Sequence, residues 1–191
     1  MSAPDDSTDL TGKLLLAMPG MGDPRFDQSV IFLCSYSENG AMGLIVNKPL
    51  PSISFSDILV QLEIETDGQQ MSRQVHVGGP VERGRGFVLH TPDYMLEDVT
   101  LDVDGCYGMT ATRDILEDMS RGDGPNKALM AMGYSGWGPG QLESEIQRNG
   151  WLICDAPLEL VFETDATKKW LAALSLMGID PLLLSSDGGH A

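Results

Sequence analysis

GYSGWGPGQLESEIQR, from Gly133 to Arg148, is the stretch of sequence that says most about the fold. Its first eight residues include four glycines, a proline and a tryptophan, and the remainder has the apolar spacing of an amphipathic helix. Glycine and proline at this density indicate a demanding backbone geometry. We therefore expect a strand over 128–134, a glycine turn, and a helix over 140–149 with Leu142 and Ile146 facing inward.

The sequence before this stretch has mainly the pattern of strands. Residues 13–18 and 29–36 are apolar on both faces, which predicts two buried strands. A hairpin turn then leads into a third strand over 41–47. Apolar residues at helical spacing follow an N-cap at Ser54 or Ser56 and predict a short helix over these strands.

The remaining elements alternate less regularly. We predict strands at 74–77, 87–91 and 151–155, a hairpin around Asp104-Gly105, a helix from a Thr112 cap to Gly122, and a last helix over 165–177. Strands come first and helices are interspersed later, which predicts an α+β fold rather than alternating βαβ units. With 191 residues and no internal repeat or linker, we expect one domain over 12–180, a disordered tail over 1–11 and a loose tail over 181–191.

Charge limits the choice of partners. The chain has 12 basic and 28 acidic residues, a formal net charge of −16. Nucleic-acid binding takes its affinity from lysines and arginines that displace counterions, so direct binding to DNA or RNA is disfavoured. An acidic surface can steer a basic protein partner toward the chain, although acidic surfaces are more often only solvated.

The N-terminal residues and the cysteines indicate the cellular compartment. Residues 1–11 carry no positive region, and the LLLAM run that follows is too short for a signal sequence or a membrane span. We therefore expect a cytoplasmic protein with no membrane segment. Cys34, Cys106 and Cys154 show neither a disulfide pattern nor a zinc-ligand spacing. Cys34 and Cys154 lie in apolar strand sequences, which predicts buried, unreactive thiols.

Three further stretches match a known pattern together with Gly133 to Arg148. They are GKLLLAMPGMGDPRFDQSV (Gly12 to Val30), GAMGLIVNKP (Gly40 to Pro49) and VGGPVERGRGFVLHTP (Val77 to Pro92). With them the chain resembles the bacterial YqgE/AlgH family along nearly its whole length. The resemblance implies a single α+β domain whose mixed, mainly antiparallel sheet curls into a partial barrel with packed helices. The family carries a transcriptional-regulator label and no established chemistry.

Catalytic patterns are weak in this sequence. Gly133 to Trp137 nearly spells the nucleophile elbow G-x-S-x-G, but Trp137 stands where the second glycine belongs, and the family pattern accepts alanine at Ser135. The glycine turn before a helix could also bind an anion, although Pro139 removes one donor. A metal site of His76, His90 and Glu82 has suitable ligand types without a diagnostic spacing. We expect no catalytic residue, metal or cofactor.

A ligand-binding groove is the hypothesis that the motifs favour most. Arg85, with Arg83, forms a small basic island, and it could bind a carboxylate or phosphate of a ligand or pair with an acid of this chain such as Asp23. If the loops of the four motifs meet, they enclose a groove with Trp137 as one wall and Arg85 as anion anchor. The candidate ligand-binding residues are Asp23, Asn47, Lys48, Arg85, His90, Tyr134 and Trp137.

Three functions follow from these observations. The first is a non-enzymatic module that binds a basic protein partner or a small anionic ligand in the groove. The second is the regulator role that the resemblance implies, exercised mainly through protein partners because of the negative charge. The third is an enzyme that uses Arg85 with a nearby acid or histidine.

Overall fold

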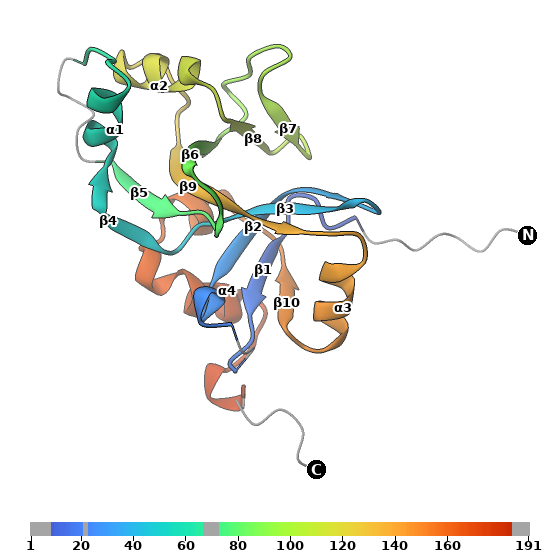
Figure 1. Ribbon diagram of the computed structural model, residues 1–191. Coiled ribbons are helices and arrows are strands. Elements are labelled where there is room, and N and C mark those ends of the chain that lie inside the picture. Colours follow the sequence, from blue (N-terminus) through green and yellow to red (C-terminus); the bar gives the residue numbers. More distant parts are fainter. Residues whose placement is uncertain (1–8, 21–22, 67–72, 185–191) are drawn as a thin grey trace, which may run out of the picture.

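The structure is a computed structural model that describes residues 9–20, 23–66 and 73–184 (Figure 1). Its strands are β1 (Leu14–Ala17), β2 (Val30–Ser37), β3 (Gly40–Ile45), β4 (Pro49–Ser54), β5 (Gln74–Val77), β6 (Val81–His90), β7 (Leu101–Val103), β8 (Tyr107–Thr110), β9 (Ala128–Trp137) and β10 (Trp151–Cys154). Its α-helices are α1 (Phe55–Gln61), α2 (Arg113–Ser120), α3 (Gln141–Gln147) and α4 (Lys169–Leu176). Short 3-10 segments are η1 (Pro24–Phe26), η3 (Ala166–Lys168) and η4 (Pro181–Leu183), and η2 (Glu159–Glu163) is a π-helical turn.

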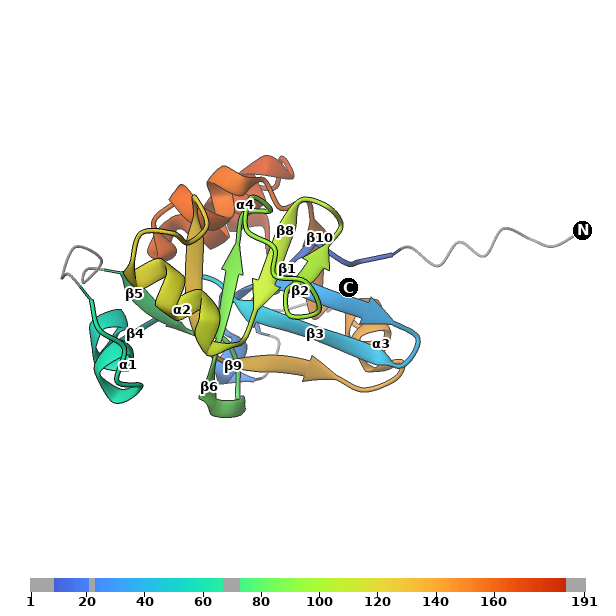
Figure 2. The same ribbon diagram turned by 90° about the horizontal axis from the view of Figure 1, so that it is seen from above.

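The strands form one curled, mixed sheet. Its main order is β10-β1-β2-β3-β9-β6-β8-β7, and β5 joins β4 to β9 beside this path. All pairings are antiparallel except that of β5 with β9. Figure 2 shows β2 and β3 crossing β6 at a steep angle, so the sheet curves into a half-barrel. The fold is thus the α+β half-barrel that the family resemblance implied.

Strand β9 joins the two halves of this sheet. Its first part pairs with β5 and β6, and its last three residues, Ser135 to Trp137, pair with β3. The change of partner occurs beside Gly133, which has a φ of +75°. A Cβ there would overlap the carbonyl oxygens of Gly79 and Val81. We call this crossing of β9 with the β5–β6 connection the sheet junction.

The sheet junction is held by backbone contacts. The Gly78 N–H donates to the Met132 carbonyl at 2.8 Å, and the Gly78 carbonyl accepts from the Ile45 N–H at 2.9 Å. At Gly79 a Cβ would overlap the backbone of Tyr134. Two of the glycine-rich motifs therefore contact each other, because only residues without a side chain let the chains approach so closely.

Helices cover both faces of the sheet. Leu14, Leu16 and Phe32 pack toward Trp170 and Leu174 of α4 in one core cluster. The alternate residues of β1 and β2 pack on the opposite face, in a second cluster with these buried members: Leu10, Leu15, Ala17, Ile31, Leu33, Ala41, Ile45, Trp137, Leu142 and Trp151. A third cluster packs α1 and α2 on β5, β6 and β9. The two apolar faces predicted for the first strands are confirmed.

Several element boundaries differ from the sequence prediction. The strand before α3 continues as far as Trp137, so Ser135 to Trp137 belong to β9 rather than to the turn. Strand β4 and the π-helical turn η2 were not predicted, and β6 begins at Val81 rather than at Phe87. The last helix is split into η3 and α4.

Of the two expected tails, 1–11 and 181–191, the structure describes only residues 9–11 and 181–184. Residues 1–8 and 185–191 lie outside the described residues. Leu10 is buried and packs in the cluster of Leu15 and Trp137, so the packed part of the chain begins before the expected boundary at residue 12. In the described part of the chain, no helix is long and apolar enough to cross a membrane.

Candidate functional site

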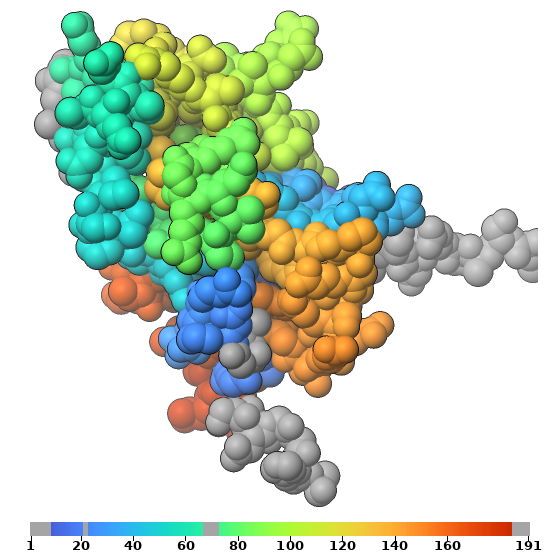
Figure 3. All heavy atoms as spheres, in the orientation of Figure 1, coloured from blue at the N-terminus to red at the C-terminus, as the bar shows by residue number. Residues whose placement is uncertain are grey.

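The main candidate site is a pocket of about 690 Å³, here called the Trp137 pocket. It lies between η1, the start of β6, the end of β9 and α3. Figure 3 shows the blue η1 segment, the green start of β6 and the orange α3 on one face of the molecule. The pocket is lined by Met18, Pro19, Gly20, Asp23, Arg25, Phe26, Pro80, Val81, Gly136, Trp137, Gln141, Glu145, Arg148, Asn149, Gly150 and Trp151.

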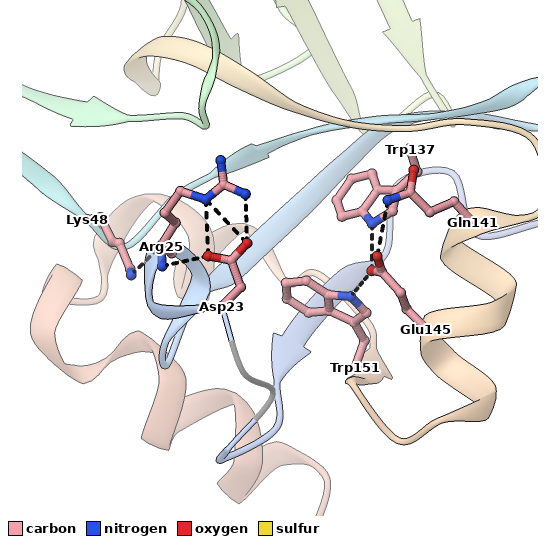
Figure 4. Close-up of polar contacts among 7 residues, drawn as sticks. All are labelled: Asp23, Arg25, Lys48, Trp137, Gln141, Glu145 and Trp151. Carbon is pink, nitrogen blue, oxygen red and sulfur yellow. Dashed lines mark hydrogen bonds and ion pairs between the residues drawn. The ribbon is translucent and has the colours of Figure 1, made fainter.

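Glu145 organises one wall of the Trp137 pocket. Its Oε2 accepts the indole N–H of Trp137 at 2.9 Å and that of Trp151 at 2.7 Å, and its Oε1 accepts from Gln141 Nε2 at 3.2 Å (Figure 4). The two indoles meet edge to face, with centroids 6.1 Å apart. One carboxylate thus fixes the orientation of both tryptophans, because hydrogen bonds to a charged acceptor are stronger than those to a neutral one.

The sequence around α3 brings Glu145 to this position. Gly140 has a φ of +74° and precedes the helix, and the side-chain oxygen of Gln141 accepts the Gly138 N–H at 3.0 Å. Leu142 is buried under the helix. Glu143 accepts the Tyr36 hydroxyl at 2.6 Å, which ties α3 to β2 and raises the pKa of Tyr36 to about 12. The acid in the first helical turn leaves little attraction for an anion there.

Asp23 and Arg25 form the opposite wall. Nε and Nη2 of Arg25 donate to the Asp23 carboxylate at 3.0 and 2.8 Å, and Asp23 also accepts the Arg25 backbone N–H at 3.0 Å. These hydrogen bonds lower the pKa of Asp23. Figure 4 shows one guanidinium nitrogen pointing away from Asp23. Phe26 meets the Trp151 ring edge to face, so this wall contacts the tryptophan wall.

Arg85 does not line the Trp137 pocket. It lies beside a shallower hollow with Tyr134 and Phe87, and this hollow meets the Trp137 pocket at Val81, Gly136 and Trp137. Its guanidinium lies 3.6 Å from Glu82 and 5.2 Å from the centre of the Phe87 ring. Arg85 therefore lies beside an acid of this chain, as one of the two alternatives expected, but that acid is Glu82 and not Asp23, whose carboxylate is bound by Arg25.

Asn47 and Lys48 hold loops together near the pocket. Asn47 accepts the Val30 N–H and donates to the Gln28 carbonyl, both at 2.9 Å, which fixes the segment before β2. Lys48 Nζ donates to the Arg25 carbonyl at 3.1 Å, and burial lowers the pKa of this amine. Both residues position η1 rather than line the Trp137 pocket.

His90 is buried and lines neither the Trp137 pocket nor the adjoining hollow. Its Nδ1 lies 2.8 Å from the Thr91 carbonyl and its Nε2 lies 2.8 Å from Thr110 Oγ1. Gly108 packs directly against the ring, so no ligand can approach from that side. The placement of His90 in the groove is therefore corrected: its ring is a hydrogen-bonded core group.

The structure thus brings together only part of the predicted set. Asp23 and Trp137 line one pocket, Arg85 and Tyr134 line the adjoining hollow, and Asn47 and Lys48 support η1. Among residues 9–20, 23–66 and 73–184, no three His, Cys, Asp or Glu side chains form a group that could hold a metal ion. Cys34 is buried, which raises the pKa of its thiol to about 12, whereas Cys154 is only partly buried and Cys106 is exposed.

The sequence prediction missed Arg25, Phe26, Glu145, Arg148 and Trp151. Arg25 and Phe26 belong to the quoted motif, but nothing in their spacing connects them to Trp137. Trp151 follows Glu145 by six residues. The two side chains meet because the chain turns after α3 and enters β10, which pairs with β1. The one available signal was that two tryptophans flank a short helix that contains acids.

The fold and this pocket together define a single-domain α+β half-barrel protein with an aromatic surface pocket. The chain belongs to the AlgH-like family, which matches residues 14–182. A UPF0301 protein of Cereibacter sphaeroides is 59% identical over 183 residues, covering 96% of this chain and all of that protein. A UPF0301 protein of Ruegeria pomeroyi is also 59% identical, over 184 residues, with the same coverage of both chains.

Solved structures agree with this assignment. The solution structure of the AlgH protein from Pseudomonas aeruginosa superposes with a TM-score of 0.79 at 37% identity, and the match covers 100% of this chain and 99% of that one. A crystal structure of a Corynebacterium diphtheriae protein superposes with a TM-score of 0.72 at 20% identity, covering 92% of each chain. The second likeness supports the fold alone.

Proposed function

We propose that this protein is a non-enzymatic binding module whose Trp137 pocket takes an apolar group that carries an anionic end, such as the carboxylate of a small molecule or a peptide. The observation that carries the proposal is Glu145, which accepts both indole N–H groups and keeps Trp137 and Trp151 oriented before any ligand arrives. Preorganised walls of this kind reduce the ordering that binding requires.

The charges of the pocket favour an anionic end. Both carboxylates are occupied by donors of this chain: Asp23 by Arg25, and Glu145 by the indoles and Gln141. The Arg25 side chain is 59% exposed, and it uses only its Nε and Nη2 atoms on Asp23. Arg148 is exposed at the rim. The groups open to a ligand are therefore cationic, and planar guanidinium groups suit carboxylates.

The same arrangement gives no support to acid-base catalysis in the pocket. A catalytic acid or base needs a carboxylate or imidazole that can exchange a proton with a substrate. Here Asp23 is bound to a guanidinium and its pKa is lowered, and the two described histidines, His76 and His90, are buried and do not line the pocket. We therefore favour binding over the alternative of an enzyme based on Arg85.

The proposal also allows a regulatory role through a protein partner. A carboxylate-bearing peptide segment of another protein meets the chemistry of the pocket, whereas the net charge of −16 opposes a phosphate backbone. We expect such an encounter in the cytoplasm, as the sequence indicates. A gel-shift experiment in physiological salt is expected to show no complex with duplex DNA.

Tryptophan fluorescence tests the pocket directly. Two of the three tryptophans line it, and the third, Trp170, is buried and donates to the Ala17 carbonyl. In a Trp170→Phe background we expect N-acetylphenylalanine, which has a carboxylate, to change the emission at lower concentration than its neutral amide does. One exposed Arg–carboxylate contact is worth about 1 kcal/mol, so the preference is expected to be roughly fivefold.

Matched arginine variants show whether the carboxylate binds in the Trp137 pocket, which Arg25 lines, or in the adjoining hollow, which Arg85 lines. Arg25→Ala is expected to abolish the preference for the carboxylate probe, and Arg85→Ala is expected to preserve it. Equal titrations of the acid and the amide, or an emission that neither probe changes, would show that the Trp137 pocket is not a site of this chemistry. Loss of the preference in Arg85→Ala alone would move the anion anchor to the adjoining hollow.

A further inference from the structure

A second cavity, of about 360 Å³, lies between β5, β9 and the segment that leads into α4. We call it the Lys169 cavity. Figure 1 shows the orange-red segment before α4 beside β4 and β5. Its lining shares no residue with that of the Trp137 pocket. Two buried titratable side chains line it: His76, which is 6% exposed, and Lys169, which is 3% exposed.

Lys169 is a buried cation held by carbonyl groups. Its Nζ donates to the carbonyl oxygens of Val46 and Val161, both at 2.7 Å. An ammonium group has three donors, so these two bonds leave one. Burial lowers the pKa of Lys169 to about 8, and the charge of Asp165 acts in the opposite direction, so most molecules carry the charge at neutral pH. Among the described residues no carboxylate forms an ion pair with it.

His76 lines the same cavity and has one ring nitrogen that can accept a hydrogen bond. Its Nδ1 lies 3.2 Å from the Met130 carbonyl and must donate to it, since a carbonyl only accepts. Burial, with a contribution from the charge of Lys169, lowers the pKa of His76 to about 4. The ring is therefore neutral at pH 7, and Nε2 carries a lone pair. His90 uses both ring nitrogens, whereas in the described part of the chain Nε2 of His76 has no hydrogen-bond partner.

The charge around the cavity favours an anion. Lys169 brings a buried positive charge to the lining, and Asp165 is the one acid among the lining residues. The carboxylate of Asp165 is engaged by the backbone N–H of Thr167 at 3.0 Å and by its hydroxyl at 2.8 Å. In a chain of charge −16, this buried cation supplies a local attraction for an anion that the surrounding acids would otherwise repel.

We propose that the Lys169 cavity is a binding site for a phosphate group that keeps one acidic O–H. In this complex the remaining donor of Lys169 binds a negatively charged oxygen, and the lone pair of His76 Nε2 accepts the O–H. Sulfate has similar size and shape but carries no proton at this pH, so it leaves the His76 acceptor unmatched. A site built around a particular hydrogen bond discriminates strongly against an analogue that lacks it.

Imidazole NMR tests the proposal on the intact protein. The chain has three histidines, and two of them, His76 and His90, are buried and described. With labelled histidine at pH 6.5 and constant ionic strength, we expect inorganic phosphate to move the His76 ring signals in a saturable way. We expect the His90 signals to stay in place, and sulfate to require at least tenfold higher concentration for the same shift.

Lysine variants locate the charge. Lys169→Met is expected to weaken phosphate binding at least tenfold, whereas Lys168→Met, which removes the same charge from the exposed neighbour, is expected to change it less than twofold. If Lys169→Met does not fold, the proposal is tested on the unmodified protein alone, by comparing the shifts of the His76 ring signals that phosphate and sulfate cause. Unmoved His76 signals, equal responses to the two anions, or equal effects of the two lysine variants would each overturn the proposal.

Discussion

The sheet junction and the Trp137 pocket share a glycine-rich stretch but use its glycines differently. At the sheet junction Gly133 is packed against the backbone of the β5–β6 connection and has no room for a Cβ. At the pocket, Gly140 has open space around its Cβ position and needs only its left-handed backbone. Gly133 lets two segments of the chain approach closely, whereas Gly140 sets the start of the helix that carries Glu145. Matching a family motif therefore does not by itself mark a ligand site.

The largest expected effect comes from adding one methyl group at the sheet junction. Gly133→Ala introduces a Cβ against the backbone carbonyls of Gly79 and Val81 at a φ of +75°, and Val81 is held by its pairing with Tyr134 of β9. Strain at such a φ alone is about 1–2 kcal/mol, and the overlap adds to it, so we expect a loss of more than about 4 kcal/mol. Urea denaturation monitored by circular dichroism measures it.

Gly122→Ala is the matched control for backbone strain. Gly122 has a φ of +80° at the end of α2, and nothing lies within 4 Å of its Cβ position. We expect a loss of only about 1–2 kcal/mol there. Equal losses at the two positions would mean that the close approach at the junction contributes nothing.

The sheet junction is also expected to be more sensitive to acid than the pocket. His76 lies two residues before Gly78, and its pKa of about 4 is below the value of about 6.5 in the unfolded chain. Because the folded state resists protonation, His76 contributes stability that is complete above pH 6.5 and is lost as the pH falls toward 4. The shift corresponds to roughly 3 kcal/mol.

A histidine variant isolates this contribution. His76→Gln keeps an amide donor for the Met130 carbonyl and does not titrate. Its free energy of unfolding is expected to vary less between pH 6.5 and pH 4 than that of the original protein. A pH profile that the substitution leaves unchanged would show that His76 is not the titrating group.

A smaller effect is expected at the pocket wall. Glu145→Gln can place its one oxygen at the Oε2 position, where both indoles donate, but the acceptor loses its charge and the new amide nitrogen faces the Gln141 amide nitrogen, which loses its acceptor. We expect a loss of about 1–3 kcal/mol and a changed tryptophan emission. Glu38→Gln, on an exposed turn, is the control and should change neither quantity. Unchanged emission in the Glu145 variant would contradict the assigned hydrogen bonds.

The outline of the fold was accessible from the sequence because it depends on local patterns. The apolar runs of β1 and β2, the Ser54 cap of α1 and the left-handed Gly122 after α2 each express a rule that acts over a few residues. Strand β4 was missed because Pro49 and Pro51 are poor strand residues, and β4 pairs with β5 at only two recorded positions.

The candidate site was less accessible because it depends on distant segments. Trp137 was identified, but its contact with Glu145 and Trp151 requires the path of β10 beside β1. Asp23 was identified too, yet its partner is Arg25 on the same turn rather than Arg85. The Lys169 cavity gave no sequence signal, since Lys169 and Val46 are 123 residues apart. Motifs identify residues, whereas their partners follow from topology.

The smallest expected effect concerns Arg85. Its side chain is 56% exposed, and it meets an equally exposed Glu82 at 3.6 Å and one face of Phe87. Exposed ion pairs and cation–π contacts of this kind are worth about 0–1 kcal/mol, so Arg85→Ala should change the free energy of unfolding by less than about 1 kcal/mol. Arg25→Ala, on the pocket wall, is the comparison for ligand effects.

A larger loss of stability in Arg85→Ala, together with altered Trp137 emission, would mean that the adjoining hollow and the Trp137 pocket are structurally coupled through their shared residues Val81 and Gly136. The comparison between the junction and the pocket would then have to include the hollow as a third region, because a residue outside the pocket would be holding its tryptophan in place.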